Sequence, residues 1–148
     1  MSDGTGVSGE KGAKSEQLVG IVLVSHSAAV AASVADLARA LVGGGATVPV
    51  AAAGGTESGE FGTSAELITA AARSVDRGAG VAVLTDLGSA VLTVKALLAE
   101  GDELPDGTRL LDAPFVEGAV AAVVTASTGA GLAAVEAAAA EAYTYRKV

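Results

Sequence analysis

Hydrophobic residues along the chain form short continuous runs separated by longer segments with helical spacing. Four runs have the length of a strand and are rich in β-branched residues: Val19–Ser25, Thr47–Ala52, Gly80–Thr85 and Arg109–Ala113. They are nearly continuous rather than alternating, which is typical of strands that are covered on both faces. The pattern therefore predicts four buried strands.

Segments of helical length follow each of these runs. The first places Val34, Leu37 and Leu41 on one apolar stripe. Thr63 or Ser64 is a plausible N-cap for the second. The predicted helices are Ala28–Val42, Thr63–Asp76, Gly88–Glu100, Phe115–Ser127 and Ala130–Tyr143. Strand–helix alternation of this kind predicts an α/β fold, with a mostly parallel four-stranded sheet in the order 2-1-3-4 sandwiched by helices.

Length and the polar start of the chain define the expected domain organisation. A chain of 148 residues fits one domain with a substantial core. Residues 1–17 are polar and glycine-rich without a hydrophobic segment, so we expect a disordered tail there rather than a signal peptide, followed by one domain over residues 18–148. Mean hydropathy is +0.53, yet no uninterrupted apolar run approaches about 18 residues. We therefore expect a cytoplasmic protein that makes no use of a membrane.

Charge and cysteine content narrow the function classes. The formal net charge is −8, which argues against an electrostatic hold on nucleic acid or on an anionic membrane. The chain has no cysteine, which excludes disulfides, thiol nucleophiles and cysteine-ligated metals. It also has a single histidine, His26, and a metal site would need more than one histidine or a carboxylate cluster, so we expect no metal.

Each predicted strand ends in residues that could take part in catalysis or ligand binding. These ends are Ser25-His26-Ser27, Gly54-Gly55-Thr56, Thr85-Asp86 and Asp112-Ala113. Ligands of open α/β sheets gather beyond the carboxyl ends of the strands. In the order 2-1-3-4 the first and third strands are neighbours, so His26 and Asp86 share one edge of the sheet. A carboxylate in that place can hold the tautomer of an imidazole.

Simpler interpretations exist for each of these residues alone. A lone histidine at a strand end is more often a hydrogen-bonding residue, Asp86 is a candidate helix cap, and Gly54-Gly55 is a candidate turn. The chain has no dinucleotide-binding or P-loop glycine motif and no hydrolase nucleophile elbow. The remaining chemistry is attack by the imidazole itself on phosphorus, with backbone N–H groups at the start of the helix after His26 holding the phosphoryl oxygens.

Four stretches, taken together and in order, carry a family resemblance. They are "GIVLVSHSAAVAASVADLA", "AAAGGTESGEFGTSAELI", "VAVLTDLGSAVLTVKALL" and "LLDAPFVEGAVAAVVTASTGA". With these stretches the chain, over 18–142, resembles the mannose-type enzyme IIA family of the bacterial phosphotransferase system, in particular its dihydroxyacetone kinase branch.

The resemblance implies a cytoplasmic, homodimeric phosphocarrier that binds no cofactor directly. His26 would accept phosphate from the histidine-phosphorylated carrier HPr and pass it to ADP bound on the nucleotide subunit of the kinase, which phosphorylates dihydroxyacetone. Asp86 would orient His26. The phosphate pocket would be lined by Ser27, Gly55, Thr63 and Ser89.

Three other functions stay open at this point. A mannose-type enzyme IIA that serves a sugar permease would use the same chemistry at His26 with another acceptor. The small tetrapyrrole chelatases also place a histidine after a first strand, but they usually need a second one, which this chain lacks. A non-enzymatic flavodoxin-like module would bind flavin, and the aromatic content of 3% leaves few rings to stack on it.

Overall fold

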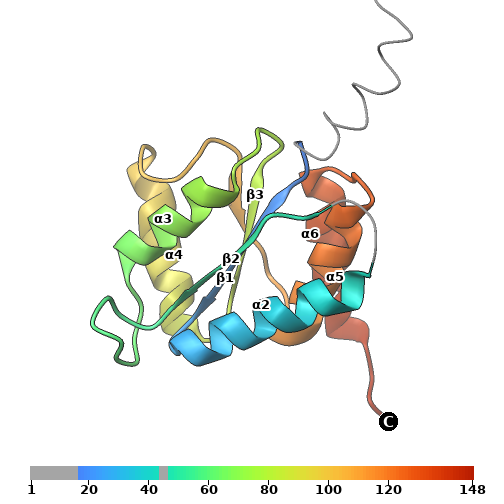
Figure 1. Cartoon of the computed structure of the whole chain (residues 1–148), viewed down its shortest axis with the longest axis horizontal. Helices are drawn as coiled ribbons and strands as arrows, with labels where there is room; N and C mark the ends of the chain where they lie inside the picture. The colour runs from blue at the N-terminus through green and yellow to red at the C-terminus, as the bar shows by residue number, and fades with distance from the viewer. Residues whose placement is uncertain (1–16, 44–46) are drawn as a thin grey trace, which may run out of the picture.

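The computed structural model describes residues 17–43 and 47–148 (Figure 1). Their centre is a four-stranded parallel sheet in the order β2-β1-β3-β4. The strands are β1 (Gly20–Ser25), β2 (Val50–Gly54), β3 (Val81–Thr85) and β4 (Thr108–Leu110). The predicted sheet and its order are thereby confirmed. The predicted tail over 1–17 lies outside the described residues except for its last residue.

Helices cover both faces of the sheet, as predicted (Figure 1). They are α2 (Ala28–Val42), α3 (Ala65–Val75), α4 (Gly88–Glu100), α5 (Phe115–Ser127) and α6 (Leu132–Glu141), and a 3-10 turn, η1 (Ala142–Thr144), follows α6. One hydrophobic core lies between the sheet and α2, α5 and α6. A second core lies between the opposite face and α3 and α4.

The central strand β1 belongs to both cores. All 6 of its residues are buried. Ile21 and Leu23 point into the core under α2, α5 and α6, whereas Val22 and Val24 point into the core under α3 and α4. Burying a side chain of this size contributes about 1.5–3 kcal/mol relative to exposure. Burial on both faces explains why this run is continuously apolar, and it makes β1 a rigid support for whatever follows it.

Several element ends differ from the prediction for local reasons. The second strand begins at Val50 and not at residue 47, since Pro49 has no N–H for the ladder; its carbonyl oxygen accepts from the N–H of Ile21 at 2.9 Å. The fourth strand is only Thr108–Leu110, because the chain then leaves β3 and turns into α5, whose N-cap is Pro114. The last helix is likewise shorter than 130–143, and η1 continues it.

No helix within residues 17–43 and 47–148 is long and apolar enough to cross a membrane.

Candidate active site

The carboxyl ends of β1 and β3 bring His26 and Asp86 together. The two strands are paired in register, with Val24 opposite Thr85, so the residues that follow them emerge side by side. The N–H of Asp86 continues this pairing and donates to the carbonyl oxygen of Val24 at 3.1 Å. The adjacency expected from the strand order is therefore present in the structure.

The carboxylate of Asp86 accepts four hydrogen bonds. Its Oδ2 accepts from the hydroxyl of Ser25 at 2.9 Å and from the backbone N–H of His26 at 3.0 Å. Its Oδ1 accepts from Nδ1 of His26 at 3.0 Å and from the backbone N–H of Leu87 at 2.7 Å. The side chain is 16% exposed, so this small set of donors provides most of its polar surroundings.

These contacts favour the ionised form of Asp86 and fix the donor in its hydrogen bond with His26. Burial raises the pKa of Asp86, but the hydrogen bonds from the His26 N–H, the Ser25 hydroxyl, the His26 ring and the Leu87 N–H together lower that pKa below its ordinary value of 3.8. The carboxylate is therefore ionised at neutral pH and can only accept. Nδ1 of His26 must therefore be the donor in this hydrogen bond, and in the neutral ring that tautomer has its lone pair on Nε2.

The other ring nitrogen faces the first turn of α4. Nε2 of His26 is hydrogen-bonded to the hydroxyl of Ser89, which must be the donor in this tautomer. The predicted residue Thr63 reaches the site only indirectly. Its hydroxyl lies 3.1 Å from the hydroxyl of Thr93, which donates in turn to the carbonyl oxygen of Ser89 at 3.2 Å.

The two helices that begin beside His26 differ in whether a side chain caps their first backbone N–H groups. In α2 the hydroxyl of Ser27 is the cap and accepts from the N–H of Val30 at 3.2 Å, so this predicted pocket residue is engaged in capping. In α4 the N-cap is Leu87, which makes no side-chain cap hydrogen bond, and a Cβ on Gly88 would meet no atom within 4 Å. The start of α4, whose first residues follow a residue without a side-chain cap, therefore offers N–H groups on the Nε2 side of the ring, in addition to the start of α2 that the sequence suggested.

Gly54 and Gly55 allow the end of β2 to pack closely against the backbone at the end of β1. A Cβ on Gly54 would lie 2.4 Å from the carbonyl oxygen of Ser27, so this close approach needs a glycine. Gly55 has a φ of +70°, and its N–H donates to the carbonyl oxygen of Ser25 at 3.0 Å. Gly55 therefore holds the end of β1 in place, and this role differs from the predicted direct contact with phosphate.

Ser25 is a site residue that the sequence did not single out beyond its place at a strand end. It is 1% exposed, its hydroxyl donates to Asp86, and its Oγ accepts from the N–H of Ser27 at 3.0 Å. Because buried hydroxyls need partners, a serine as the last residue of an otherwise apolar strand was the available signal.

Replacing Ser25 by alanine should destabilise the protein by about 1–3 kcal/mol, because a donor to a carboxylate and the acceptor of a backbone N–H are lost together. Urea unfolding measures this free energy. The control is Ser127→Ala, which removes an exposed hydroxyl bonded only to the carbonyl of Val124 and should change stability by at most about 0.5 kcal/mol. Equal stability of both variants would contradict the role given to Ser25.

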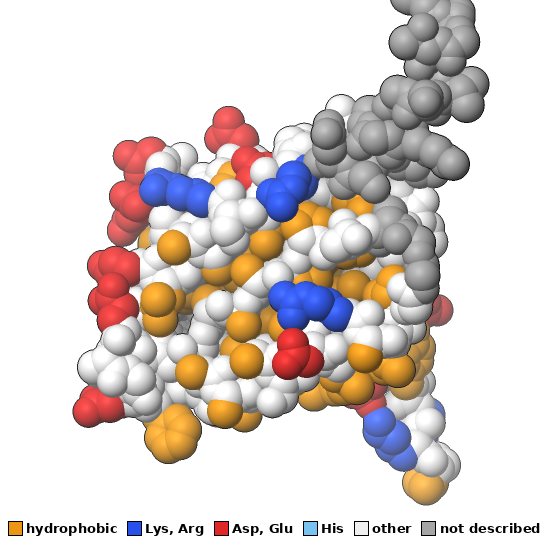
Figure 2. All heavy atoms as spheres, viewed as in Figure 1, with side chains coloured by type: hydrophobic (Ala, Val, Ile, Leu, Met, Phe, Trp, Pro, Cys, Tyr) orange, Lys and Arg blue, Asp and Glu red, His pale blue; other side chains and the backbone are white. Residues whose placement is uncertain are grey.

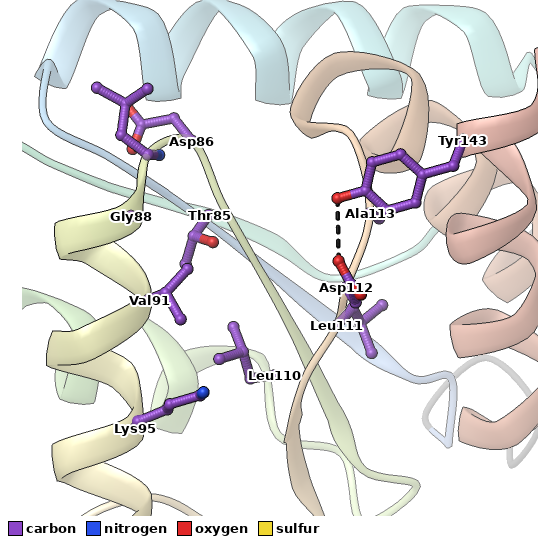
Figure 3. Close-up of a pocket in the computed structure, with 11 residues that line it drawn as sticks. Thr85, Asp86, Gly88, Val91, Lys95, Leu110, Leu111, Asp112, Ala113 and Tyr143 are labelled. Atoms are coloured by element: carbon purple, nitrogen blue, oxygen red, sulfur yellow. Dashed lines mark hydrogen bonds between the residues drawn. The ribbon is translucent and has the colours of Figure 1, made fainter.

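A cleft of about 460 Å³ opens next to Asp86, between α4 and the segment that follows β4 (Figure 3). Thr85, Asp86 and Lys95 line one side of it, and Asp112 and Tyr143 line the other. The hydroxyl of Tyr143 donates to Asp112 at 3.0 Å, and this bond, with a smaller effect of burial, raises the pKa of the phenol. His26 does not line this cleft, which adjoins the site through Asp86, Leu87 and Gly88.

One further group of carboxylates lies close together in the described part of the chain. Oxygen atoms of Glu100, Asp102 and Glu103 all lie within 4.8 Å of one another. These residues lie at and just after the C-terminal end of α4, whereas His26 is near its N-terminal end. They are exposed or half-buried, and a carboxylate oxygen of Glu103 lies 3.9 Å from the guanidinium of Arg73. Nothing else marks this surface cluster as a metal site.

Comparisons with known proteins show which family the chain resembles. The family model of the PTS system fructose IIA component, EIIA-man, matches residues 20–136. The phosphoryl donor subunit DhaM of PEP-dependent dihydroxyacetone kinase 2 from Listeria innocua is 35% identical over 108 residues, which are 72% of this chain and 85% of that protein. The subunit of the same name from Escherichia coli K12 is 36% identical over 78% of this chain, but this chain spans only 25% of that protein.

Solved structures share the fold. A crystal structure of a protein of unknown function superposes with a TM-score of 0.73 and 27% identity, over 84% of this chain and 95% of that one. A sigma-54 interaction domain protein from Enterococcus faecalis has a TM-score of 0.58 at 20% identity, over 81% of this chain and 86% of that one, and shows the fold alone.

Proposed function

This chain belongs to the EIIA-man family of phosphotransferase-system components, and on that premise we propose that it is the phosphoryl donor subunit of a PEP-dependent dihydroxyacetone kinase, with His26 as the phosphorylated residue. The observation that carries the proposal is the pairing of His26 with Asp86. Nδ1 donates to an ionised carboxylate, so Nε2 is left as a nucleophile at the carboxyl edge of the sheet.

In the proposed first step, the lone pair of Nε2 attacks phosphorus on phospho-HPr. The P–N bond of the donor breaks and its electron pair returns to the donor imidazole. The ring of His26 keeps the proton on Nδ1 and becomes positively charged, and the Asp86 carboxylate at 3.0 Å stabilises that charge. Ser89 turns its hydroxyl from Nε2 to a phosphoryl oxygen, and N–H groups of the first turn of α4 hold the others.

In the proposed second step, a terminal phosphate oxygen of ADP on the nucleotide subunit of the kinase attacks the phosphoryl group. The Nε2–P bond breaks and its electrons return to the imidazole of His26. The ATP so formed on the partner phosphorylates dihydroxyacetone. This cycle needs no cofactor or metal held by the chain itself. We propose, further, that it runs in the cytoplasm on a homodimer, in which Gly55 and Thr63 support the phosphate pocket through the backbone and through α4.

The names of the relatives favour the kinase over a sugar permease as the destination of the phosphate. The relatives from Listeria innocua and Escherichia coli are both named as phosphoryl donor subunits of dihydroxyacetone kinases. The chemistry at His26 is the same in both cases, so the acceptor has to be tested directly.

The test is to incubate the chain with phosphoenolpyruvate, enzyme I and HPr, and to locate the phosphoryl group by mass spectrometry. We expect it on His26, and, once phosphoenolpyruvate and HPr have been removed, we expect it to disappear when an excess of the ADP-loaded nucleotide subunit of the kinase is added. Absence of phosphate on His26 would refute the carrier role. Phosphate that stays on His26 with the kinase subunit but leaves with a permease IIB component would favour the permease.

Gly88→Pro should slow phosphate acceptance about 10- to 100-fold while leaving the fold intact. Gly88 is the first residue of α4, where proline is tolerated, and Leu87 before it is extended at φ −131°, ψ 166°, as a residue preceding proline should be. Proline removes one of the N–H groups at the start of α4 that we propose hold the phosphoryl oxygens. Gly88→Ala keeps that N–H and is the control. Initial rates of labelling by phospho-HPr measure the effect. Equal rates for both variants would contradict the proposed role of the α4 N–H groups.

A further inference from the structure

We propose that Phe61, Leu87 and Leu92 form an apolar collar around His26 that docks the phosphoryl donor, a protein with an apolar patch, basic surroundings and a surface phosphohistidine. The inference rests on the proposed function and adds the surface through which the donor is recognised. The three side chains are 86%, 62% and 67% exposed.

The collar residues come from two segments, the start of α4 and the loop between β2 and α3, and both segments contact His26 or its partners. Leu87 follows Asp86 and donates its N–H to the same carboxylate. Leu92 lies three residues after Ser89 on α4, so the two side chains are neighbours on the helix surface. Phe61 precedes Gly62, whose N–H donates to the carbonyl oxygen of His26 at 2.9 Å.

The loop that carries Phe61 is fixed in place by hydrogen bonds. Its internal bonds run from the N–H of Thr56 to the carbonyl oxygen of Glu60 and from the N–H of Gly59 to that of Thr56, both at 2.9 Å. The N–H of Glu60 also donates to the hydroxyl of Thr56 at 3.1 Å. Phe61 is thus presented to solvent by an ordered loop, which lowers the entropic cost of using it as a contact.

Phe61 is one of the few aromatic residues of this chain, and its side chain is exposed to water. The sequence has only two phenylalanines and two tyrosines, and its cores are built from aliphatic residues. Aromatic residues are enriched in the buried centres of protein interfaces, and contiguous exposed apolar residues mark interaction sites. A phenylalanine exposed on a fixed loop beside the reactive residue is therefore explained by a partner.

The donor fits this collar better than the acceptor does. The side chain of His26 is 24% exposed, and both of its ring nitrogens are hydrogen-bonded to neighbouring side chains, so the ring is held within the site and is not extended into solvent. Transfer between two histidines brings two surfaces into direct contact at the reacting nitrogens. An acceptor that holds its nucleotide in a cleft would instead need a projecting histidine.

The acidic residues near the collar indicate which charges the donor should carry around its apolar patch. Glu57 and Glu60 are exposed on the same loop as Phe61. Figure 2 shows acidic side chains along the edge of the molecule that carries α3, α4 and the loop between β2 and α3, while the basic ones are scattered. A donor with basic side chains around its apolar patch would be steered to this edge, and the rate would fall as salt is added.

The experiment measures phosphorylation of His26 by increasing concentrations of phospho-HPr. For the double variant Phe61→Ser/Leu92→Ala we expect the KM for phospho-HPr to rise about tenfold or more with little change in kcat, since such anchors dominate interface affinity. Labelling by phosphoramidate, a small donor that needs no docking, should proceed at the parent rate. The control is Leu37→Ala/Leu41→Ala, which removes two leucines of 43% and 58% exposure near the far end of α2.

The outcomes separate the docking surface from the proposed function. If phospho-HPr does not label the parent protein on His26, the proposed function fails. If it does, and the double variant has the parent KM, only the collar is wrong. Slower labelling by phosphoramidate as well would show that these residues act on the chemistry or the fold, which would also overturn docking. An unchanged donor step with slower onward transfer to the kinase subunit would assign the collar to the acceptor instead.

Discussion

His26→Gln should fold like the parent protein and accept no phosphate from phospho-HPr. His26 is the only histidine of the sequence, so no second imidazole can take over the nucleophilic role. Glutamine keeps the backbone N–H that donates to Asp86 at 3.0 Å and loses the ring contact, which should cost about 1 kcal/mol of stability. Mass spectrometry of the intact chain after incubation with phosphoenolpyruvate, enzyme I and HPr measures the result.

Glu100→Gln is the matched control for that experiment, because it also introduces a glutamine, at an exposed position at the far end of α4. It should be labelled at the parent rate. Labelling of the His26→Gln protein at any stoichiometric level would show that another residue carries the phosphate, and the carrier mechanism on His26 would then be wrong.

The fold was predictable because the sheet is buried on both faces. All 6 residues of β1 are buried, which explains why its run is short, nearly continuous in apolar residues and rich in β-branched ones. Element ends were less predictable because tertiary contacts decide them. Arg109–Ala113 has the composition of a strand, yet only the pairs up to Leu110 form, since the chain must leave β3 to start α5 after Pro114.

The site was predictable to the extent that it depends on strand order. Parallel neighbours place the residues after β1 and β3 side by side, and His26 and Asp86 follow from that alone. Details that depend on side-chain direction did not follow. The resemblance implies that Ser27 and Thr63 line the phosphate pocket, and the structure adds that the hydroxyl of Ser27 caps α2 and that Thr63 contacts Thr93 of α4.

Asp86→Asn should slow phosphoryl transfer by about 10²-fold or more without unfolding the protein. Four donors converge on the carboxylate, from Ser25, the backbone and ring of His26, and Leu87. An amide has one acceptor oxygen, so its NH₂ group must face some of these donors. If it faces Nδ1, the ring adopts the other tautomer and Nε2 carries a proton in place of its lone pair. The same change costs about 10⁴-fold in a serine hydrolase triad.

Comparison of Asp86→Asn with Asp86→Ala separates orientation of the imidazole from helix capping. Capping alone predicts a loss of about 0.5–2 kcal/mol in the alanine variant with transfer rates unchanged. The structure disfavours it, because the N-cap of α4 is Leu87.

Orientation and charge stabilisation by Asp86 predict slower transfer in both variants, with the larger effect for asparagine, and a changed lifetime of the phosphohistidine. They also predict a change in acid stability. Because the folded protein lowers the pKa of Asp86, its ionised form stabilises the fold above the ordinary value of 3.8, and this contribution is lost as the pH falls further through the lowered pKa. Neither variant should show that component of acid unfolding. Rates of labelling, decay of the phosphohistidine and unfolding as a function of pH measure these three quantities on the same proteins. Transfer at the parent rate in both variants would remove Asp86 from the mechanism.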